Sequence, residues 1–394
     1  MNGMQLERVY NTLSKLEKAK ELLRNNEDIS KINRDLMEDY IQFRRLENLN
    51  EQTILRYYNR FKMISEKFNN GFQLNKATKK EVNELVLKIN ESNLCLNTKA
   101  EDLGLIVSFY RNFLKNPNLV EDIKIKRETK KRAPSEILTE DDILNMINTT
   151  SSVRDKCIIS VLGDSGLRVG ELINLKVKNV SYTDDNLIQL MVETGKTGGR
   201  RVLLIPSVPH LSNWLNHHPF KDDGESWLFP SLDHKNYLKQ MTHASINVML
   251  HKIAKKINLR KAVNPHAFRR YSATQSSNYM SDTTLMIRYG WTKRDTVSRY
   301  TFLNPKEADD SYRRGFGKKE IEVKESKLQP IKCICKTLNA SGSDFCVNCG
   351  RPLNLRVVIK NQSEKEIAWN LLNEILDDEL KQVIKRKLQE KINT

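Results

Sequence analysis

The sequence predicts a mainly α-helical protein with a small antiparallel β-sheet. Apolar residues recur at helical spacing through most of the 394-residue chain, which predicts the helices. Two short apolar runs flank a glycine-rich turn in residues 186–206, which predicts one β-hairpin. Four cysteines near the C-terminus indicate a small separate module. A chain of this length is expected to form several domains.

The N-terminal part is expected to be a helical domain of residues 1–122 with basic faces. Four segments show the helical apolar pattern: 6–23, 32–46, 51–68 and 101–116. A linker of residues 123–134 follows, in which six basic residues between Lys124 and Arg132 are interrupted by one glutamate. Such a run is usually a solvated linker, but it can also lie along phosphates.

The largest unit is expected to span residues 135–316. Thr139 precedes three acidic residues, which is typical of a helix N-cap. Residues 154–180 predict a buried helix, a tight glycine-containing turn and a second helix, and Lys196 lies at the tip of the predicted hairpin. Helices are expected to resume between Thr242 and Tyr312.

The C-terminal part divides into a polar linker (317–330), the cysteine module (331–353) and a final region (354–394). Residues 363–392 predict one long amphipathic helix, with leucine or isoleucine at every fourth position from Leu372 to Leu388. This helix either packs on its own chain or pairs with another protomer.

The charge of the chain indicates a polyanionic partner. Lys and Arg outnumber Asp and Glu by 66 to 49, which gives a net charge of +17 and favours nucleic acid over an anionic membrane surface. No apolar run approaches the roughly 20 residues that span a bilayer, and the N-terminus lacks the apolar core of a signal peptide. We therefore expect a soluble, cytoplasmic protein that binds nucleic acid.

Three separated stretches carry residues suited to phosphate chemistry: Arg168 after a Gly-Leu turn, His266 with Arg269 after a proline, and Trp291 followed by Tyr300 on what is expected to be a helix. Singly, each residue has an ordinary explanation, as a salt-bridged arginine, a helix cap or a core aromatic. Together with Lys196, and in this order and spacing, they resemble the tyrosine recombinase family, which includes phage integrases and Xer recombinases. The resemblance is strongest over residues 135–305 and extends more loosely, as a core-binding domain, over residues 28–120.

The resemblance implies a role for each of these residues. Tyr300 is expected to attack a DNA phosphate and form a 3′-phosphotyrosyl bond, while Arg168 and Arg269 clamp the non-bridging oxygens. Lys196 is the expected general acid for the leaving 5′ oxygen, and His266 is expected to orient the phosphate and assist proton movement. Trp291 stands at a position that is commonly histidine. Because an indole cannot shuttle a proton, Trp291 is expected to contact phosphate and support Tyr300.

Several neighbouring residues depart from the family pattern or compete with Tyr300. Tyr289 stands where leucine is usual, and Arg270 stands where histidine is frequent. Tyr271, Tyr289 and Tyr312 are rival nucleophiles, but only Tyr300 has the family's spacing. Glu171, one turn after Arg168, either supports that arginine or forms an ordinary helix salt bridge.

The cysteine cluster resembles a short zinc ribbon. Cys333 and Cys335 precede Cys346 and Cys349, and four thiolates at this density are expected to hold a structural zinc ion. Free or redox-active thiols are the alternative, and contact of the module with DNA or with protein stays open. Two further residues, Cys95 and Cys157, are expected to be buried and inert.

The resemblance therefore implies a site-specific DNA recombinase of integrase type, acting for a mobile element of prokaryotic or viral origin. It would work as a homotetramer on double-stranded DNA, without ATP or a catalytic metal. The alternatives are Xer-like chromosome dimer resolution, type IB topoisomerase-like DNA relaxation, and a catalytically inactive zinc-ribbon regulator that binds DNA.

Overall fold

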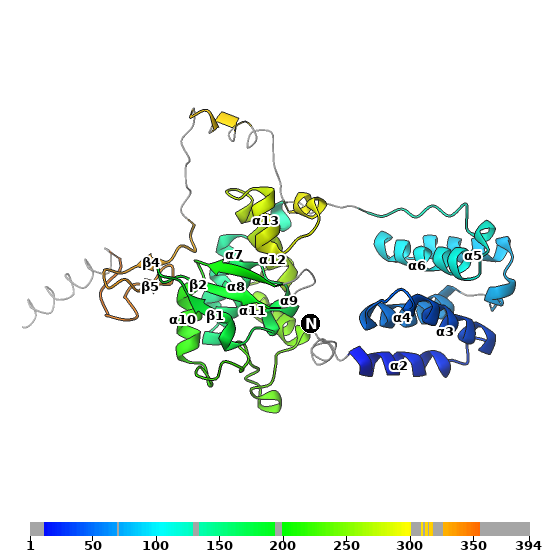
Figure 1. Cartoon of the computed structure of the whole chain (residues 1–394), viewed down its shortest axis with the longest axis horizontal. Helices are drawn as coiled ribbons and strands as arrows, with labels where there is room; N and C mark the ends of the chain where they lie inside the picture. Colours follow the sequence, from blue (N-terminus) through cyan, green and yellow to red (C-terminus); the bar gives the residue numbers. More distant parts are fainter. Residues whose placement is uncertain are drawn as a thin grey trace, which may run out of the picture. The chain divides into compact units, whose positions relative to one another are not determined.

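The computed structural model describes residues 12–68, 71–128, 134–193, 199–300, 309, 312–313, 315–317 and 326–354. The chain divides into two compact units, Met1–Ala133 and Pro134–Thr394. Two predictions lie outside the described residues: the position of Lys196 and the helix expected over 363–392. Figure 1 shows the elements of both units.

The described part of the first unit is helical. It contains five α-helices and a π-helical turn, Phe109–Phe113: α2 (Thr12–Arg24), α3 (Lys31–Arg45), α4 (Glu51–Phe68), α5 (Lys79–Glu91) and α6 (Leu96–Ser108). The core centres on Tyr40, whose ring packs edge-on against Phe61 at 5.4 Å and whose hydroxyl donates to Ser108 Oγ at 2.9 Å. Aromatic contacts of this geometry fix how helices from distant parts of the segment meet.

The second unit combines helices with a three-stranded antiparallel sheet, as the sequence predicts. Its strands are β1 (Val180–Tyr182), β2 (Ile188–Val192) and β3 (Arg200–Leu204), in the order β1-β2-β3. Ile188 pairs with Leu204 and Val192 with Arg200, which confirms the hairpin. Its helices, labelled in Figure 1, are α7 (Glu140–Thr149), α8 (Val153–Ser165), α9 (Val169–Ile173), α10 (Val208–Asn216), α11 (His243–Lys256), α12 (Pro265–Ser276) and α13 (Asp282–Tyr289).

Helix α8 is the centre of this unit. It is buried over most of its length and packs against α7, α10, α12 and strand β3. The helix ends at Gly166, whose φ of 57° is the left-handed conformation that favours glycine. Upstream, Thr139 caps α7 through a reciprocal capping box with Asp142, which confirms the predicted N-cap.

Two sequence expectations are wrong. Trp291 and Tyr300 do not share one helix, because α13 ends at Tyr289 and Gly290 turns the chain with a φ of 60°. A separate 3₁₀ helix, Arg294–Arg299, precedes Tyr300. Cys95 is exposed at the N-cap of α6, with its Sγ 3.0 Å from Thr98 Oγ1, whereas Cys157 is buried as expected.

The cysteine module contains strands β4 (Ile331–Lys332) and β5 (Leu338–Asn339), which pair antiparallel. Among the described residues, no helix combines the length and the apolar character needed to cross a membrane.

Candidate active site

The turn between α8 and α9 places Arg168. Arg168 is the N-cap residue of α9, and its backbone N–H donates to Glu171 Oε2 at 2.8 Å. Its Nη1 donates to Glu171 Oε1 at 2.8 Å, so the carboxylate fixes both the backbone and the guanidinium. The side chain of Arg168 is one-third exposed, which leaves part of the guanidinium accessible.

Glu171 is held by a second arginine that sequence reasoning missed. Arg200, at the start of β3, donates from Nη1 and Nη2 to the two carboxylate oxygens at 2.9 and 2.8 Å. Burial raises the pKa of Glu171, but the hydrogen bonds and charge of Arg200, followed by those of Arg168, lower it below its ordinary value of 4.5. Glu171 is therefore an ionised bridge between two arginines.

Arg269, on α12, is a buried cation. It is 3% exposed and donates to two backbone carbonyls, those of Gly166 at 2.8 Å and Tyr289 at 2.5 Å. Burial lowers the pKa of Arg269 to about 10, and the charge of Arg168 acts in the same direction. Among the described residues, no carboxylate forms an ion pair with Arg269, so its positive charge is not neutralised directly and is suited to an anion.

The C-terminal end of α13 gathers three arginines. The carbonyls of Arg288, Tyr289 and Gly290 accept hydrogen bonds from Arg200, Arg269 and Arg168, at 2.9, 2.5 and 3.3 Å respectively. The last carbonyls of a helix lack partners within the helix and carry its negative dipole end. This end of α13 therefore attracts guanidinium groups from α12, β3 and the start of α9.

Tyr300 is the last ring in a stack of three aromatic side chains. Its ring stacks on Trp291 with 4.8 Å between centroids and 14° between planes, and Trp291 stacks in turn on Tyr289 at 5.0 Å and 21°. Trp291 and Tyr300 are 7% and 8% exposed. Both aromatics thus belong to a core cluster, together with the buried Val297, and the guanidinium carbon of Arg269 lies 5.5 Å from the Trp291 ring centroid.

His266 approaches Tyr300 from the first turn of α12. Its ring centroid is 6.2 Å from that of Tyr300, at an interplanar angle of 72°, and its side chain is exposed. The structure thus brings together Arg168, Arg269, Trp291, Tyr300 and His266. Lys196 belongs to residues 194–198, which are outside the described part of the hairpin.

The rival tyrosines differ from Tyr300 in their surroundings. Tyr289 is fully buried, with its hydroxyl 2.7 Å from Ser272 Oγ and 2.9 Å from Ser276 Oγ. Tyr271 is 3% exposed, and burial raises the pKa of its phenol well above the ordinary value. Tyr312 is largely exposed, and the ring contact described for it is with Phe316.

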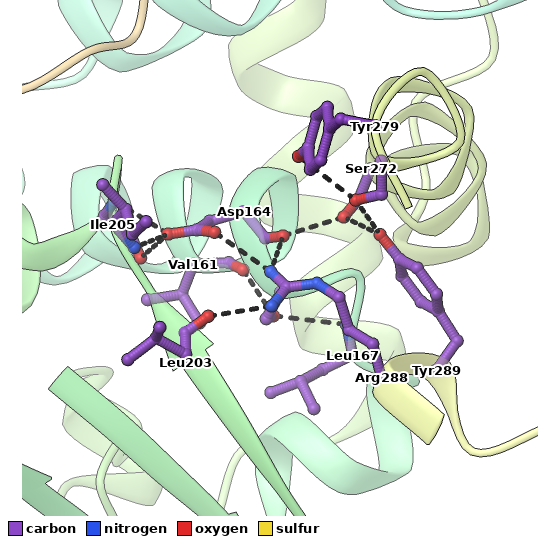
Figure 2. Close-up of polar contacts among 12 residues, drawn as sticks. Val161, Asp164, Leu167, Leu203, Ile205, Ser272, Tyr279, Arg288 and Tyr289 are labelled. Carbon is purple, nitrogen blue, oxygen red and sulfur yellow. Dashed lines mark hydrogen bonds and ion pairs between the residues drawn. The ribbon is translucent and has the colours of Figure 1, made fainter. Parts of the chain in front are cut away.

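A partly buried polar network anchors α13 to α8 and β3 (Figure 2). Asp164 Oδ2 accepts from the backbone N–H groups of Ile205 and Ser207 at 2.9 and 3.1 Å. Arg288 donates from Nη1 to the Leu203 carbonyl and from Nη2 to the Asp164 carbonyl, both at 3.0 Å. These hydrogen bonds therefore fix the end of α13 relative to α8 and to the hairpin.

The four cysteines of the C-terminal module form a second candidate site. The Sγ atoms of Cys333, Cys335, Cys346 and Cys349 all lie within 4.8 Å of one another. Asn339, at the end of β5, accepts the backbone N–H of Val347 at 2.9 Å and so ties the two cysteine pairs together. Four thiolates this close form a donor set that fits one tetrahedral metal ion.

Comparison with known proteins agrees with this geometry. Residues 136–307 match the model of the phage integrase family. The tyrosine recombinase XerA of Pyrococcus horikoshii is 27% identical over 244 residues, covering 62% of this chain and 80% of that protein. XerA of Pyrococcus furiosus is 25% identical over 285 residues, covering 71% and 93%.

Two solved structures share the fold. The Tn1549 transposon integrase in complex with transposon right end DNA has a TM-score of 0.56 at 18% identity, covering 71% of this chain and 98% of that one. A lambda integrase dimer bound to a core site has a TM-score of 0.53 at 17% identity, covering 68% and 94%. Residues 136–307, which contain the arginine and tyrosine cluster, therefore form a domain of the phage integrase family.

Proposed function

We propose that this chain is a site-specific recombinase of integrase type that cuts and rejoins double-stranded DNA for a mobile element. The observation that carries the proposal is the position of Tyr300, stacked on Trp291 beside Arg269, whose guanidinium carbon lies 5.5 Å from the indole centroid. The DNA complexes solved for the Tn1549 and lambda integrases support DNA as the partner. The net charge of +17 supports it independently.

In the proposed reaction, the Tyr300 phenol oxygen attacks the phosphorus of one DNA strand. A phosphorus–oxygen bond to the tyrosine forms as the bond to the 5′ oxygen breaks, so the 3′ phosphate becomes attached to Tyr300 and a 5′ hydroxyl is released. Attack by a 5′ hydroxyl of a partner strand reverses these bonds and frees the tyrosine. The number of phosphoester bonds is conserved, so the reaction requires no ATP. Arg168 and Arg269 stabilise the charge of the transition state in this proposal, so no catalytic metal is included.

Arg168 and Arg269 are the proposed phosphate clamp. Negative charge accumulates on the non-bridging oxygens in the transition state, and preorganised guanidinium groups stabilise it. Burial and the charge of Arg168 disfavour the charged state of Arg269 in the free protein. A phosphate anion relieves this repulsion, so the two arginines favour the ligand that the reaction requires.

The remaining proposed roles concern protons. Lys196 protonates the leaving 5′ oxygen, and His266 orients the phosphate and assists proton movement at the tyrosine. Trp291 donates one hydrogen bond and supports the Tyr300 ring, but it has no proton to exchange near neutral pH.

We also propose that Cys333, Cys335, Cys346 and Cys349 bind one structural zinc ion, supported by the closeness of their sulfur atoms. The active species on DNA is a homotetramer, because an exchange between two duplexes needs four strand cleavages. The helical unit and the linker of residues 123–134 add sequence-independent contacts to phosphates.

Trapping of the covalent intermediate tests the proposed function. The substrate is a duplex selected from a random-sequence library by binding to the full-length chain, then nicked at successive positions so that a short fragment is lost after cleavage. The native protein is expected to form a denaturation-resistant adduct, and Tyr300→Phe is expected to form none, because the phenol oxygen is the nucleophile. Tyr312→Phe, which removes an exposed rival hydroxyl, is the matched control and should retain the adduct.

An adduct that persists in Tyr300→Phe would assign the nucleophile to another residue. Relaxation of supercoiled DNA without exchange between defined sites would instead indicate topoisomerase-like activity.

A further inference from the structure

We propose that Tyr289 is a positioning residue for the reaction, which holds Trp291, Arg269 and, through them, Tyr300 in the arrangement that attacks phosphate. Tyr289 is fully buried and touches no surface that DNA could reach, so it can act only through its neighbours. The inference depends on the proposed role of Tyr300 as nucleophile.

The first observation is the continuous stack of three rings. Tyr289 lies under Trp291, and Trp291 lies under Tyr300, with centroid distances of 5.0 and 4.8 Å and both pairs near parallel. The position of the Tyr289 ring therefore limits where the Trp291 indole can lie, and the indole in turn supports the Tyr300 ring. A leucine at position 289 would offer a smaller, flexible surface in place of a flat one.

The second observation is the way Tyr289 is itself fixed. Its hydroxyl lies between Ser272 and Ser276 of α12, and Ser272 Oγ donates to the Asp164 carbonyl at 2.8 Å (Figure 2). Because each hydroxyl has one proton, Ser272 must accept from Tyr289, and Tyr289 in turn accepts from Ser276. The chain of hydrogen bonds thus runs in one direction and ends on the backbone of α8.

The third observation is the close fit between Tyr289 and the turn after α8. A Cβ atom at Gly166 would lie 2.6 Å from Tyr289 Cε1, so only glycine leaves room for the ring. The carbonyl of the same Gly166 accepts from Arg269. The left-handed turn therefore provides space for Tyr289 and a hydrogen-bond acceptor for the clamp at the same position.

The fourth observation is a direct link between Tyr289 and the clamp. The guanidinium carbon of Arg269 lies 5.3 Å from the Tyr289 ring centroid and 5.5 Å from that of Trp291, and Arg269 Nη2 also donates to the Tyr289 carbonyl. Aromatic faces stabilise a desolvated cation. Tyr289 thus contacts both parts of the proposed machinery, the clamp and the support of the nucleophile.

The test compares three variants of the full-length chain. Tyr289→Phe keeps the ring and removes the hydroxyl, Tyr289→Leu removes the ring, and Tyr271→Leu is a matched control, since Tyr271 is a buried tyrosine of α12 outside the stack. On the nicked duplex at saturating protein, Tyr289→Leu is expected to form the Tyr300 adduct on the order of 10- to 100-fold more slowly, because small displacements of reacting groups are costly. Its DNA affinity should stay within about threefold of native, since Tyr289 contacts no DNA.

Tyr289→Phe is expected to recover most of the cleavage rate, and Tyr271→Leu to cleave at the native rate per folded molecule. If Tyr289→Leu and Tyr271→Leu lose cleavage rate and thermal stability equally, Tyr289 is an ordinary core residue. That outcome would overturn the proposal. So would an unchanged cleavage rate in Tyr289→Leu.

A second measurement does not require catalysis. Labelling the four tryptophans with ¹⁵N gives one indole signal each, and Trp291→Phe identifies the signal of Trp291. Ring currents from Tyr289 shift this signal, so Tyr289→Leu should move it and Tyr271→Leu should leave it in place. An unmoved signal in Tyr289→Leu contradicts the stack. If the native protein forms no adduct through Tyr300, the proposed function fails, while the indole signal still decides whether Tyr289 positions Trp291.

Discussion

Arg269 is a buried cation, and the groups around it explain why its charge is tolerated inside the fold. Two backbone carbonyls and two aromatic faces surround the guanidinium in place of a carboxylate. A directly paired carboxylate would neutralise the charge and compete with a phosphate. The arrangement therefore keeps the positive charge available at the cost of a lowered pKa.

The neighbouring carboxylate, Glu171, forms ion pairs with Arg168 and Arg200. Replacing it with glutamine leaves the side chain of Arg200, which is only 7% exposed, without its ion pair. We expect Glu171→Gln to lower the free energy of unfolding by about 3 kcal/mol at pH 7, measured by urea denaturation, because a buried charge loses its partner. Glu225→Gln, which removes an exposed carboxylate bound to Lys176 and Lys178, is the control and should change stability little.

The same substitution has a predicted pH dependence. Because the pKa of Glu171 is lowered in the folded chain, its contribution is complete above the ordinary value of 4.5 and disappears as the pH falls through the folded value. The difference in unfolding free energy between the native chain and Glu171→Gln should therefore shrink below pH 4.5. A difference that grows on acidification would contradict the ionised bridge.

At the scale of elements, the short helix α13 has more influence than its eight residues suggest. Its C-terminal carbonyls organise three arginines that arrive from α9, β3 and α12. Helix ends attract cations because their carbonyls are unpaired and aligned. Arg168, Arg200 and Arg269 are thus positioned by backbone atoms, which no side-chain substitution at the acceptor residues removes directly.

The cysteine module is the second element with a testable property. We expect about one zinc ion per chain by metal analysis of protein prepared under reducing conditions, and Cys346→Ser is expected to lose most of it. Cys95→Ser removes an exposed cysteine of the other unit and should retain the full amount. Protein that contains no zinc while its four thiols stay reduced would exclude a structural metal.

Removal of the proposed zinc ion by a chelator should unfold the cysteine module. Two strands of two residues each cannot hold residues 331–353 together alone, so proteolysis within this stretch should accelerate once the metal is removed.

At the scale of the whole molecule, the excess of basic residues should make DNA binding strongly dependent on salt. Lys124, Lys126 and Arg127 are exposed in the described part of the linker. If each neutralises one phosphate, changing all three to glutamine should reduce the slope of log affinity against log salt by about 2 to 3. Fluorescence anisotropy between about 50 and 200 mM salt measures that slope.

A control variant with the same net charge distinguishes direct contacts between the linker and DNA from the general attraction of a basic protein to DNA. Lys221, Lys235 and Lys252 are exposed in the second unit, and their change to glutamine removes the same charge outside the linker. Equal changes of slope in both variants would show that the linker has no special position on DNA.

Much of the fold and part of the site could be predicted from the sequence, for identifiable reasons. Periodicity located the helices of the first unit except α5, and the glycine-rich turn located the hairpin. The order and spacing of the motifs predict one site made of five residues, and the structure places these residues together: Arg168, His266, Arg269, Trp291 and Tyr300. The separate 3₁₀ helix before Tyr300 was missed because Gly290 was not recognised as a helix end.

Other features depend on tertiary contacts that no local pattern reveals. Arg200 follows the glycine-rich turn like any basic residue at a strand start, and only the folded hairpin brings it to Glu171. Cys95 has apolar neighbours in sequence but occupies a helix N-cap, where the side chain faces solvent. Tyr289 was noticed only as a departure from the family pattern, and its ring contacts appear only in three dimensions.

The left-handed turn at Gly290 has a consequence for control of the enzyme. It connects, within a dozen residues, the carbonyls that align the arginines and Tyr300, the proposed nucleophile. A displacement of this segment would move Tyr300 and the carbonyls that accept from Arg168, Arg200 and Arg269 together. In the proposed reaction, the nucleophile and the phosphate clamp would therefore be gained or lost as one unit.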